Sequence, residues 1–172
     1  MPGTPETTPA AKQVSDAPSP RRLLSTEKVY EGRIWDVVSD SFQLQETGTA
    51  LTRDYIDHPG AVAVLPMNAA GEILLLKQYR HPVGMDLWEI PAGLLDIEGE
   101  DFVVGAAREL AEEAEIEFHW ISLDEAVASV LAGRLHNPSA VVGILAAAAA
   151  RARGYAHLRP ADAPWPAHPS QR

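Results

Sequence analysis

Apolar and polar positions along the first half of the chain follow the short periods of β-strands, and turn-forming residues separate the runs. The predicted strands occupy residues 28–44, where Gly32 separates two of them, then 51–57, 61–67 and 72–79. The 61–67 run is almost entirely apolar, which is typical of a strand buried on both faces. A turn at residues 68–71 predicts that the 72–79 strand is the hairpin partner of this run.

The second half of the chain predicts three helices and one strand. The helices are predicted at residues 101–114, 123–131 with Ser122 as its N-cap, and 139–153 with Gly154 after its end. Between the first two, Ile116, Phe118 and Trp120 alternate with polar residues, so a strand is predicted directly after a helix. This order of elements predicts an α+β fold.

Proline-rich ends frame the predicted folded part. Residues 1–20 hold five prolines among small and polar residues, and so little apolar surface predicts a disordered tail. Residues 156–172 predict a second, proline-rich tail. The dipeptide at positions 59 and 60, Pro-Gly, separates a small N-terminal β subdomain (21–58) from a main domain (59–155).

Composition and charge narrow the function. The 172 residues are 46% hydrophobic, which is enough for a packed core, and the net charge of −10 argues against nucleic acid or an anionic membrane as partner. The chain has no cysteine, which excludes disulfides, thiolate zinc sites and cysteine nucleophiles. The first residues lack the pattern of a signal peptide, and the longest apolar stretch is about half of a membrane span. We therefore expect a soluble cytoplasmic protein.

Three glutamates on the predicted 101–114 helix are the strongest candidates for chemistry. Glu109, Glu112 and Glu113 are spaced i, i+3 and i+4, which places their carboxylates on one face. Taken alone, such glutamates are more often a solvated surface than a site. The preceding loop favours a site, because Gly93 ends an apolar strand where backbone can approach a ligand closely. Hard oxygen ligands at this density suit Mg²⁺ or Mn²⁺.

This stretch resembles the box of the Nudix hydrolase family, G-x5-E-x7-R-E-U-x-E-E-x-G-U, in which U is a bulky aliphatic residue. Six rather than five residues separate the first Gly and Glu in this chain. Eight of the nine fixed positions match, at Gly93, Glu100, Arg108, Glu109, Leu110, Glu112, Glu113 and Ile116. Segments around Arg53, Arg80 and Asn137, together with Leu87–Gly93, resemble the ADP-ribose pyrophosphatase branch. The resemblance covers about residues 21–165 and implies an α/β/α sandwich around a mixed sheet.

The resemblance also implies an activity, which is metal-dependent hydrolysis of the diphosphate bond of a nucleoside diphosphate linked to another group. ADP-ribose would give AMP and ribose 5-phosphate. By position, the ligands of Mg²⁺ or Mn²⁺ would be the carbonyl of Ala92 with Glu109, Glu112 and Glu113, the last two also being catalytic. Gly93 and Arg108 would organise this site.

Substrate and subunit contacts are implied in the same way. Arg53, Arg80 and Trp35 would bind the substrate, and the N-terminal strands would form a homodimer. For each arginine an ordinary surface charge is an equally good interpretation. For Trp35 a place in the core is the commoner one.

One box position departs from the family. A glycine that ends the helix is replaced by Glu115, and the next strand follows at once. The family has roughly forty further residues there, in two strands with their loops. In the ADP-ribose branch that segment supplies a glutamate base, for which Glu117 is the nearest candidate here, although a surface role suits it better.

The departure therefore predicts a main domain shortened near residues 114–117. The cause would be an in-frame deletion, either natural or introduced by an error in the gene model. We expect metal binding to be partly retained and turnover to be weak or absent. The alternatives are a catalytically inactive remnant that binds a nucleotide or a protein, and a fragment without function. The shortening also predicts an open sheet edge, because the missing strands would have paired there.

Overall fold

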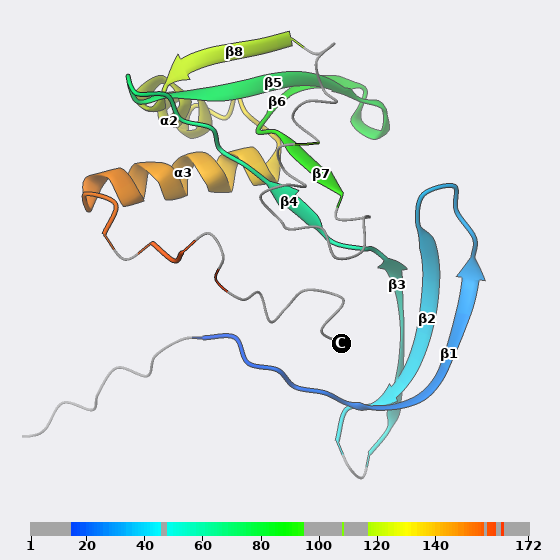
Figure 1. Cartoon of the computed structure of the whole chain (residues 1–172). Coiled ribbons are helices and arrows are strands. Elements are labelled where there is room, and N and C mark those ends of the chain that lie inside the picture. The colour runs from blue at the N-terminus through cyan, green and yellow to red at the C-terminus, as the bar shows by residue number, and fades with distance from the viewer. Residues whose placement is uncertain are drawn as a thin grey trace, which may run out of the picture. The chain divides into compact units, whose positions relative to one another are not determined.

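A computed structural model describes residues 15–45, 48–94, 108, 117–156, 158–160 and 163. The chain divides into two compact units, Met1–Asp57 and His58–Arg172, and each is considered by itself (Figure 1). Residues 15–20 of the predicted N-terminal tail have no regular structure and are exposed. The rest of that tail, the predicted 101–114 helix apart from Arg108, and most of the 156–172 tail lie outside the described residues.

The first unit is a three-stranded antiparallel sheet. Its strands, in spatial order, are β1 (Arg22–Tyr30), β2 (Asp36–Gln43) and β3 (Ala50–Asp57). The predicted strands are confirmed, but β1 begins earlier than the aromatic and β-branched pattern indicated, because its first residues pair along β2 as far as Gln43. Among the described residues of this unit, Val38 alone is buried. A sheet with so little buried surface is not expected to be stable without further packing.

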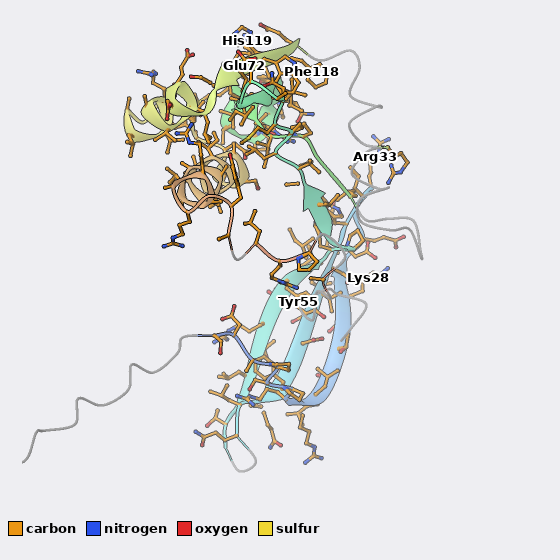
Figure 2. All side chains as sticks on the ribbon, turned by 60° about the vertical axis from the view of Figure 1, so that its left-hand side comes forward. Lys28, Arg33, Tyr55, Glu72, Phe118 and His119 are labelled. Atoms are coloured by element: carbon orange, nitrogen blue, oxygen red, sulfur yellow. The ribbon has the colours of Figure 1, made fainter. Side chains whose placement is uncertain are left out.

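Gly32 is required by the turn between β1 and β2. A Cβ on this residue would lie 2.0 Å from the carbonyl oxygen of Trp35. The Gly32 N–H donates to Oδ1 of Asp36 at 3.2 Å, and Asp36 also forms an ion pair with Lys28, a residue near the end of β1 that Figure 2 labels. Hydrogen bonding from the Lys28 ammonium lowers the pKa of the Asp36 carboxyl. Backbone packing and one carboxylate therefore hold this turn together.

Replacing Gly32 with alanine should destabilise the protein by about 2 kcal/mol, because the turn must shift to admit the new methyl group. The matched control is Gly48→Ala in the turn between β2 and β3, where, among the described residues, a Cβ would meet only the Cβ of Gln45 at 3.8 Å. Urea unfolding followed by circular dichroism measures both. Equal midpoints for the two variants would contradict this account of the turn.

The second unit contains two antiparallel sheets. The larger has the spatial order β6 (Met85–Glu89), β5 (Glu72–Arg80) and β8 (Glu117–Ser122), and the smaller pairs β4 (Ala61–Ala63) with β7 (Ala92–Leu94). A 3₁₀ turn, η1 (His81–Val83), joins β5 to β6. The strand predicted from the alternation at residues 116–120 is confirmed as β8, which pairs with β5 over its whole length.

The predicted hairpin between residues 61–67 and 72–79 is wrong in extent. The first strand ends at Ala63 and pairs with β7, so only a single bridge, Met67 to Ile73, joins the two segments in the described chain. Pro66 accounts for part of this, since it has no N–H to donate to a ladder. Its carbonyl still accepts from the Leu74 N–H at 3.0 Å.

Two helices, α2 (Leu123–Leu131) and α3 (Pro138–Ala152), pack on the larger sheet (Figure 1). The cap predicted for α2 is confirmed, because Oγ of Ser122 accepts the N–H of Glu125 at 3.1 Å. The third predicted helix is confirmed as α3 but begins one residue earlier, since Oδ1 of Asn137 caps it by accepting the Ala140 N–H at 2.9 Å. No helix in the described part of the chain is both long and apolar enough to cross a membrane.

The core lies between the larger sheet and the two helices. Its buried members are Ile73, Leu75, Ile90, Leu123, Ala126, Ala140 and Ile144. Side chains alternate along a strand, so Leu74 and Leu76 lie on the opposite face of β5, and only 8% and 1% of each is exposed. The sheet is therefore buried on both faces. The predicted α+β class, with its three-layer arrangement, is consistent with this burial.

Candidate active site

Strand β7 carries the backbone part of the candidate site. The Val64 N–H donates to the carbonyl of Pro91 at 2.9 Å, and Gly93 lies opposite Val62 in the ladder with β4. Backbone groups of successive residues in a strand point to opposite sides. The carbonyls of Pro91 and Gly93 therefore face β4, and the carbonyl of Ala92 faces the other side.

Arg108 marks what lies on that other side. Its Nη2 donates to the carbonyl of Leu94 at 3.4 Å, and this carbonyl points the same way as that of Ala92, two residues away. Arg108 is helical and half-buried, and it is the one residue of the predicted 101–114 helix that the structure describes. Arg108, which precedes Glu109 in the sequence, is therefore held against β7 on the side that the Ala92 carbonyl faces.

The carboxylates of the candidate metal site are not described. Glu109, Glu112 and Glu113 lie outside the described residues, as do Glu100 and Glu115. Within the described ranges, no group of three or more His, Asp or Glu side chains could hold a metal ion. The donor set that the sequence offers to a metal ion therefore joins a backbone carbonyl to carboxylates carried by the segment after Arg108. An all-oxygen set of this kind fits Mg²⁺ or Mn²⁺.

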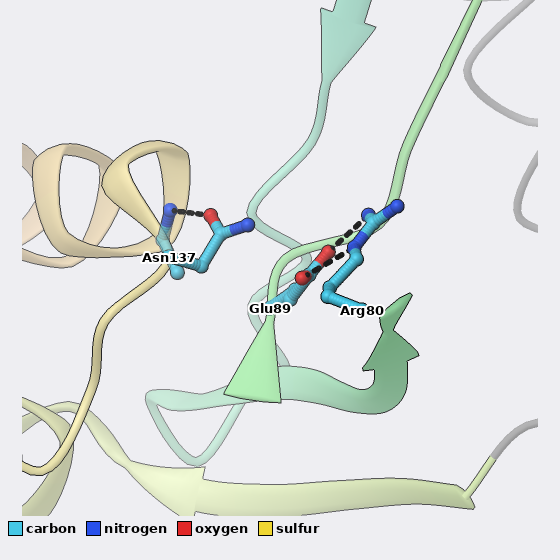
Figure 3. A network of polar contacts seen from close by, with 4 residues as sticks. Arg80, Glu89 and Asn137 are labelled. Carbon is cyan, nitrogen blue, oxygen red and sulfur yellow. Dashed lines mark hydrogen bonds and ion pairs between the residues drawn. The ribbon is translucent and has the colours of Figure 1, made fainter. Parts of the chain in front are cut away.

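Glu89 is a residue of this region that the sequence reasoning did not single out. Only 3% of this residue is exposed, and it is the only buried charged residue among those that the structure describes. Its Oε1 accepts Nε of Arg80 at 2.8 Å and its Oε2 accepts Nη2 at 2.5 Å, which makes a bidentate ion pair (Figure 3). The available signal was a single carboxylate inside the apolar run Leu87–Pro91. Arg80 is thus more than an ordinary surface charge.

The other two predicted substrate residues lie in the first unit. Arg53 is opposite Asp40 in the register of β2 and β3, and its Nη1 donates to the carbonyl of Thr52 at 2.7 Å. Asp40 accepts hydrogen bonds from the hydroxyl of Tyr55 at 3.1 Å and from a threonine hydroxyl on β1 at 2.8 Å. Trp35 is 39% exposed just before β2, so the alternative interpretation as a core residue is wrong.

Comparisons with known proteins point to one family. A family model described as NUDIX domain matches residues 57–132. The ADP-ribose pyrophosphatase of Mycobacterium tuberculosis is 31% identical over 187 residues, which cover 83% of this chain and 89% of that protein. The ADP-ribose pyrophosphatase of Bacillus subtilis is 38% identical over 92 residues, about half of each chain (54% and 49%). A crystal structure of an ADP compounds hydrolase matches 84% of this chain and 100% of that one, with a TM-score of 0.64 at 16% identity.

The Mycobacterium alignment also bears on the length of the domain. It has 187 positions, although the whole chain has only 172 residues. Because 83% of 172 is about 143 residues, about 44 of the 187 positions face gaps in this chain. This number is close to the roughly forty residues that two strands and their loops require.

Proposed function

The chain belongs to the Nudix hydrolase family, and we propose that it hydrolyses the diphosphate bond of a nucleoside diphosphate linked to another group. ADP-ribose is the proposed substrate, with AMP and ribose 5-phosphate as products. One observation carries the proposal: the Ala92 carbonyl faces the side of β7 on which Arg108 contacts Leu94. The name of the Mycobacterium relative, which this chain covers at 89% of its length, supports the choice of substrate.

In this proposal the metal site is formed by the carbonyl of Ala92 and by Glu109, Glu112 and Glu113. Mg²⁺ or Mn²⁺ held there would neutralise phosphate oxygens and lower the pKa of a bound water. Glu112 and Glu113 would be the catalytic carboxylates. Arg108, through the Leu94 carbonyl, would hold the helix that carries them against β7.

Substrate binding is assigned to three side chains. Arg80 and Arg53 would contact the phosphates or the terminal ribose, since guanidinium groups bind phosphate oxygens bidentately. Trp35, exposed at 39%, would stack on the adenine. No described residue takes the position of a general base. Glu117, the nearest candidate, lies at the start of β8 with 63% of its side chain exposed, 3.7 Å from the Lys77 ammonium.

The decisive experiment measures AMP release from ADP-ribose by chromatography, with Mg²⁺ and with a chelator. We expect metal-dependent release that is slower than ~1 s⁻¹, a rate at the low end for enzymes, because the base is missing. A rate of ~1 s⁻¹ or more would contradict the effect assigned to the shortening. Complete absence of release at every Mg²⁺ concentration would contradict the hydrolase itself.

The second candidate function is a catalytically inactive remnant that binds a nucleotide or a protein. It is favoured by Glu115, which stands where the family box has a helix-ending glycine, and by the proposed loss of roughly forty residues near 114–117. Calorimetric titration of ADP-ribose in the presence of Mg²⁺ separates the two functions. Binding without cleavage of the diphosphate would favour the remnant.

We also propose a cytoplasmic homodimer, formed through the sheet of the first unit. Large apolar side chains are exposed over this unit, at Leu23, Leu24, Val29, Tyr30, Ile34, Trp35, Leu44, Tyr55 and Ile56. An apolar surface of this extent is typical of an interface. Light scattering during gel filtration should give twice the mass of one chain, and a single-chain mass would contradict the dimer. The net charge of −10 supports the absence of nucleic-acid and membrane partners.

A further inference from the structure

We infer that Glu89 is a positioning residue, which sets the direction of the Arg80 guanidinium toward the diphosphate of the substrate. The inference rests on the proposed function, because it assigns a role to a group that does not itself contact the substrate. It adds a residue that lies outside the box pattern found in the sequence.

The geometry of the pair is specific. Arg80 is the last residue of β5 and lies opposite Met85 in the ladder with β6, yet its guanidinium reaches Glu89, which lies opposite Leu76. Contact through Nε and Nη2 engages one edge of the planar guanidinium with both carboxylate oxygens. Two parallel hydrogen bonds fix the plane of the group, so they also fix where its Nη1 end points.

Burial is unequal within the pair, and this identifies which partner is the anchor. The Glu89 side chain is 4% exposed, whereas 45% of the Arg80 side chain is exposed. A buried carboxylate has few alternative positions and is costly to leave unpaired. A half-exposed guanidinium can contact a phosphate while it remains bound to the carboxylate. Glu89 is thus the fixed partner and Arg80 is the one that faces ligands.

The anchor is also tied to the proposed metal site. Glu89 is joined to Ala92 by Ile90 and Pro91, which are both buried, and the proline ring restricts the backbone between them. The Pro91 carbonyl is further held by the Val64 N–H at 2.9 Å. The carboxylate that holds the guanidinium and the Ala92 carbonyl therefore belong to one short, packed segment. This arrangement would keep a phosphate-binding group at a constant place relative to the metal.

If Glu89 acted through its charge alone, it would weaken substrate binding rather than strengthen it. A neighbouring carboxylate offsets the positive charge of Arg80, so it would weaken attraction to a diphosphate if attraction were all that mattered. Positioning predicts that removing the carboxylate weakens binding, because the guanidinium then samples many directions. The sign of the change in affinity distinguishes the two roles.

The experiment is a double-mutant cycle of wild type, Glu89→Gln, Arg80→Lys and the double variant. Lysine keeps a positive charge beside Glu89, which protects folding, but it lacks the planar fork. Asp124→Asn is the matched control, since it makes the same kind of change in the exposed ion pair with Arg151. The readouts are the Kd of ADP-ribose with Mg²⁺, the KM and kcat of hydrolysis, and the thermal unfolding midpoint.

We expect Glu89→Gln to raise the Kd and KM about tenfold, with a smaller change in kcat. In the Arg80→Lys background the same substitution should change the Kd less than twofold, because the group that it positions is gone. Asp124→Asn should leave all three values unchanged. Tighter or unaltered binding by Glu89→Gln would overturn the inference, and so would losses that multiply in the double variant.

Two further arms cover the remaining outcomes. If Glu89→Gln does not fold, Glu89→Asp keeps the charge but withdraws the anchor by one methylene, and a KM at the wild-type value would then overturn the inference. If wild type does not bind ADP-ribose, the proposed substrate fails and the cycle is measured with ADP and with inorganic pyrophosphate. Binding of neither would overturn the positioning role together with the proposed function.

Discussion

Replacing Glu109 and Glu113 together with glutamine should weaken the binding of Mn²⁺, and of Mg²⁺, by about 100-fold or more. The neutral amide oxygen of glutamine is a poorer ligand for a hard divalent ion than a carboxylate, and the site would lose two negative charges. Changes to residues that only support a metal ligand already cost 10- to 100-fold in affinity. Calorimetric titration with Mn²⁺ in the presence of ADP-ribose measures the effect directly, whatever the rate of turnover.

The control for this prediction is the double variant Glu27→Gln and Glu125→Gln. Both residues are exposed in the structure, one on β1 and one in the first turn of α2, so the same two charges are removed from residues outside the proposed ligand set. We expect its metal affinity to equal that of wild type. Unaltered affinity in the Glu109 and Glu113 variant would end the proposal of a metal site on this helix.

Elements whose signals lie close together in the sequence were predicted well. The helix α2 follows a serine whose hydroxyl accepts an N–H three residues later, and α3 ends before Gly154, which has a φ of 61°. Strand pairing was predicted less well, because an apolar run does not specify its partner. Residues 61–67 lie next to β5 in sequence, but their ladder is formed with β7, about thirty residues later.

The candidate site shows the same contrast between local signals, which the sequence reveals, and contacts that depend on the fold. The box pattern predicted Gly93 and Arg108 as candidates, since residue types at fixed spacing are visible in the sequence. The direction of the Ala92 carbonyl could not be predicted, because it depends on which residues of β7 face β4. Glu89 was missed for a related reason. Its partner Arg80 comes nine residues earlier, across a turn, and only the folded hairpin brings the two side chains together.

The proposed shortening of the domain would have a structural consequence that can be reversed. In the described part of the larger sheet, β8 pairs with β5 on one side only, so it is an edge strand. The Mycobacterium relative has about 44 additional positions, inferred from an alignment of 187 positions that includes 83% of this chain. We propose that most of these positions form one segment near residues 114–117, which supplies both strands and the general base, as the family resemblance implies. General acid–base catalysis contributes about 10²- to 10⁴-fold to enzyme rates.

Inserting that segment of the Mycobacterium protein between Ala114 and Glu115 should therefore raise kcat for ADP-ribose by about 10²-fold or more. A glycine-serine linker of equal length at the same place is the control, because a flexible loop restores length at little entropic cost but supplies neither strands nor a base. Chromatographic measurement of AMP release compares the two insertions with the original chain. If the chimera folds and binds ADP-ribose but is no faster than the linker variant, the missing segment is not what limits turnover. The limit would then lie in the residues that the chain retains, with the metal-binding helix as the first place to look.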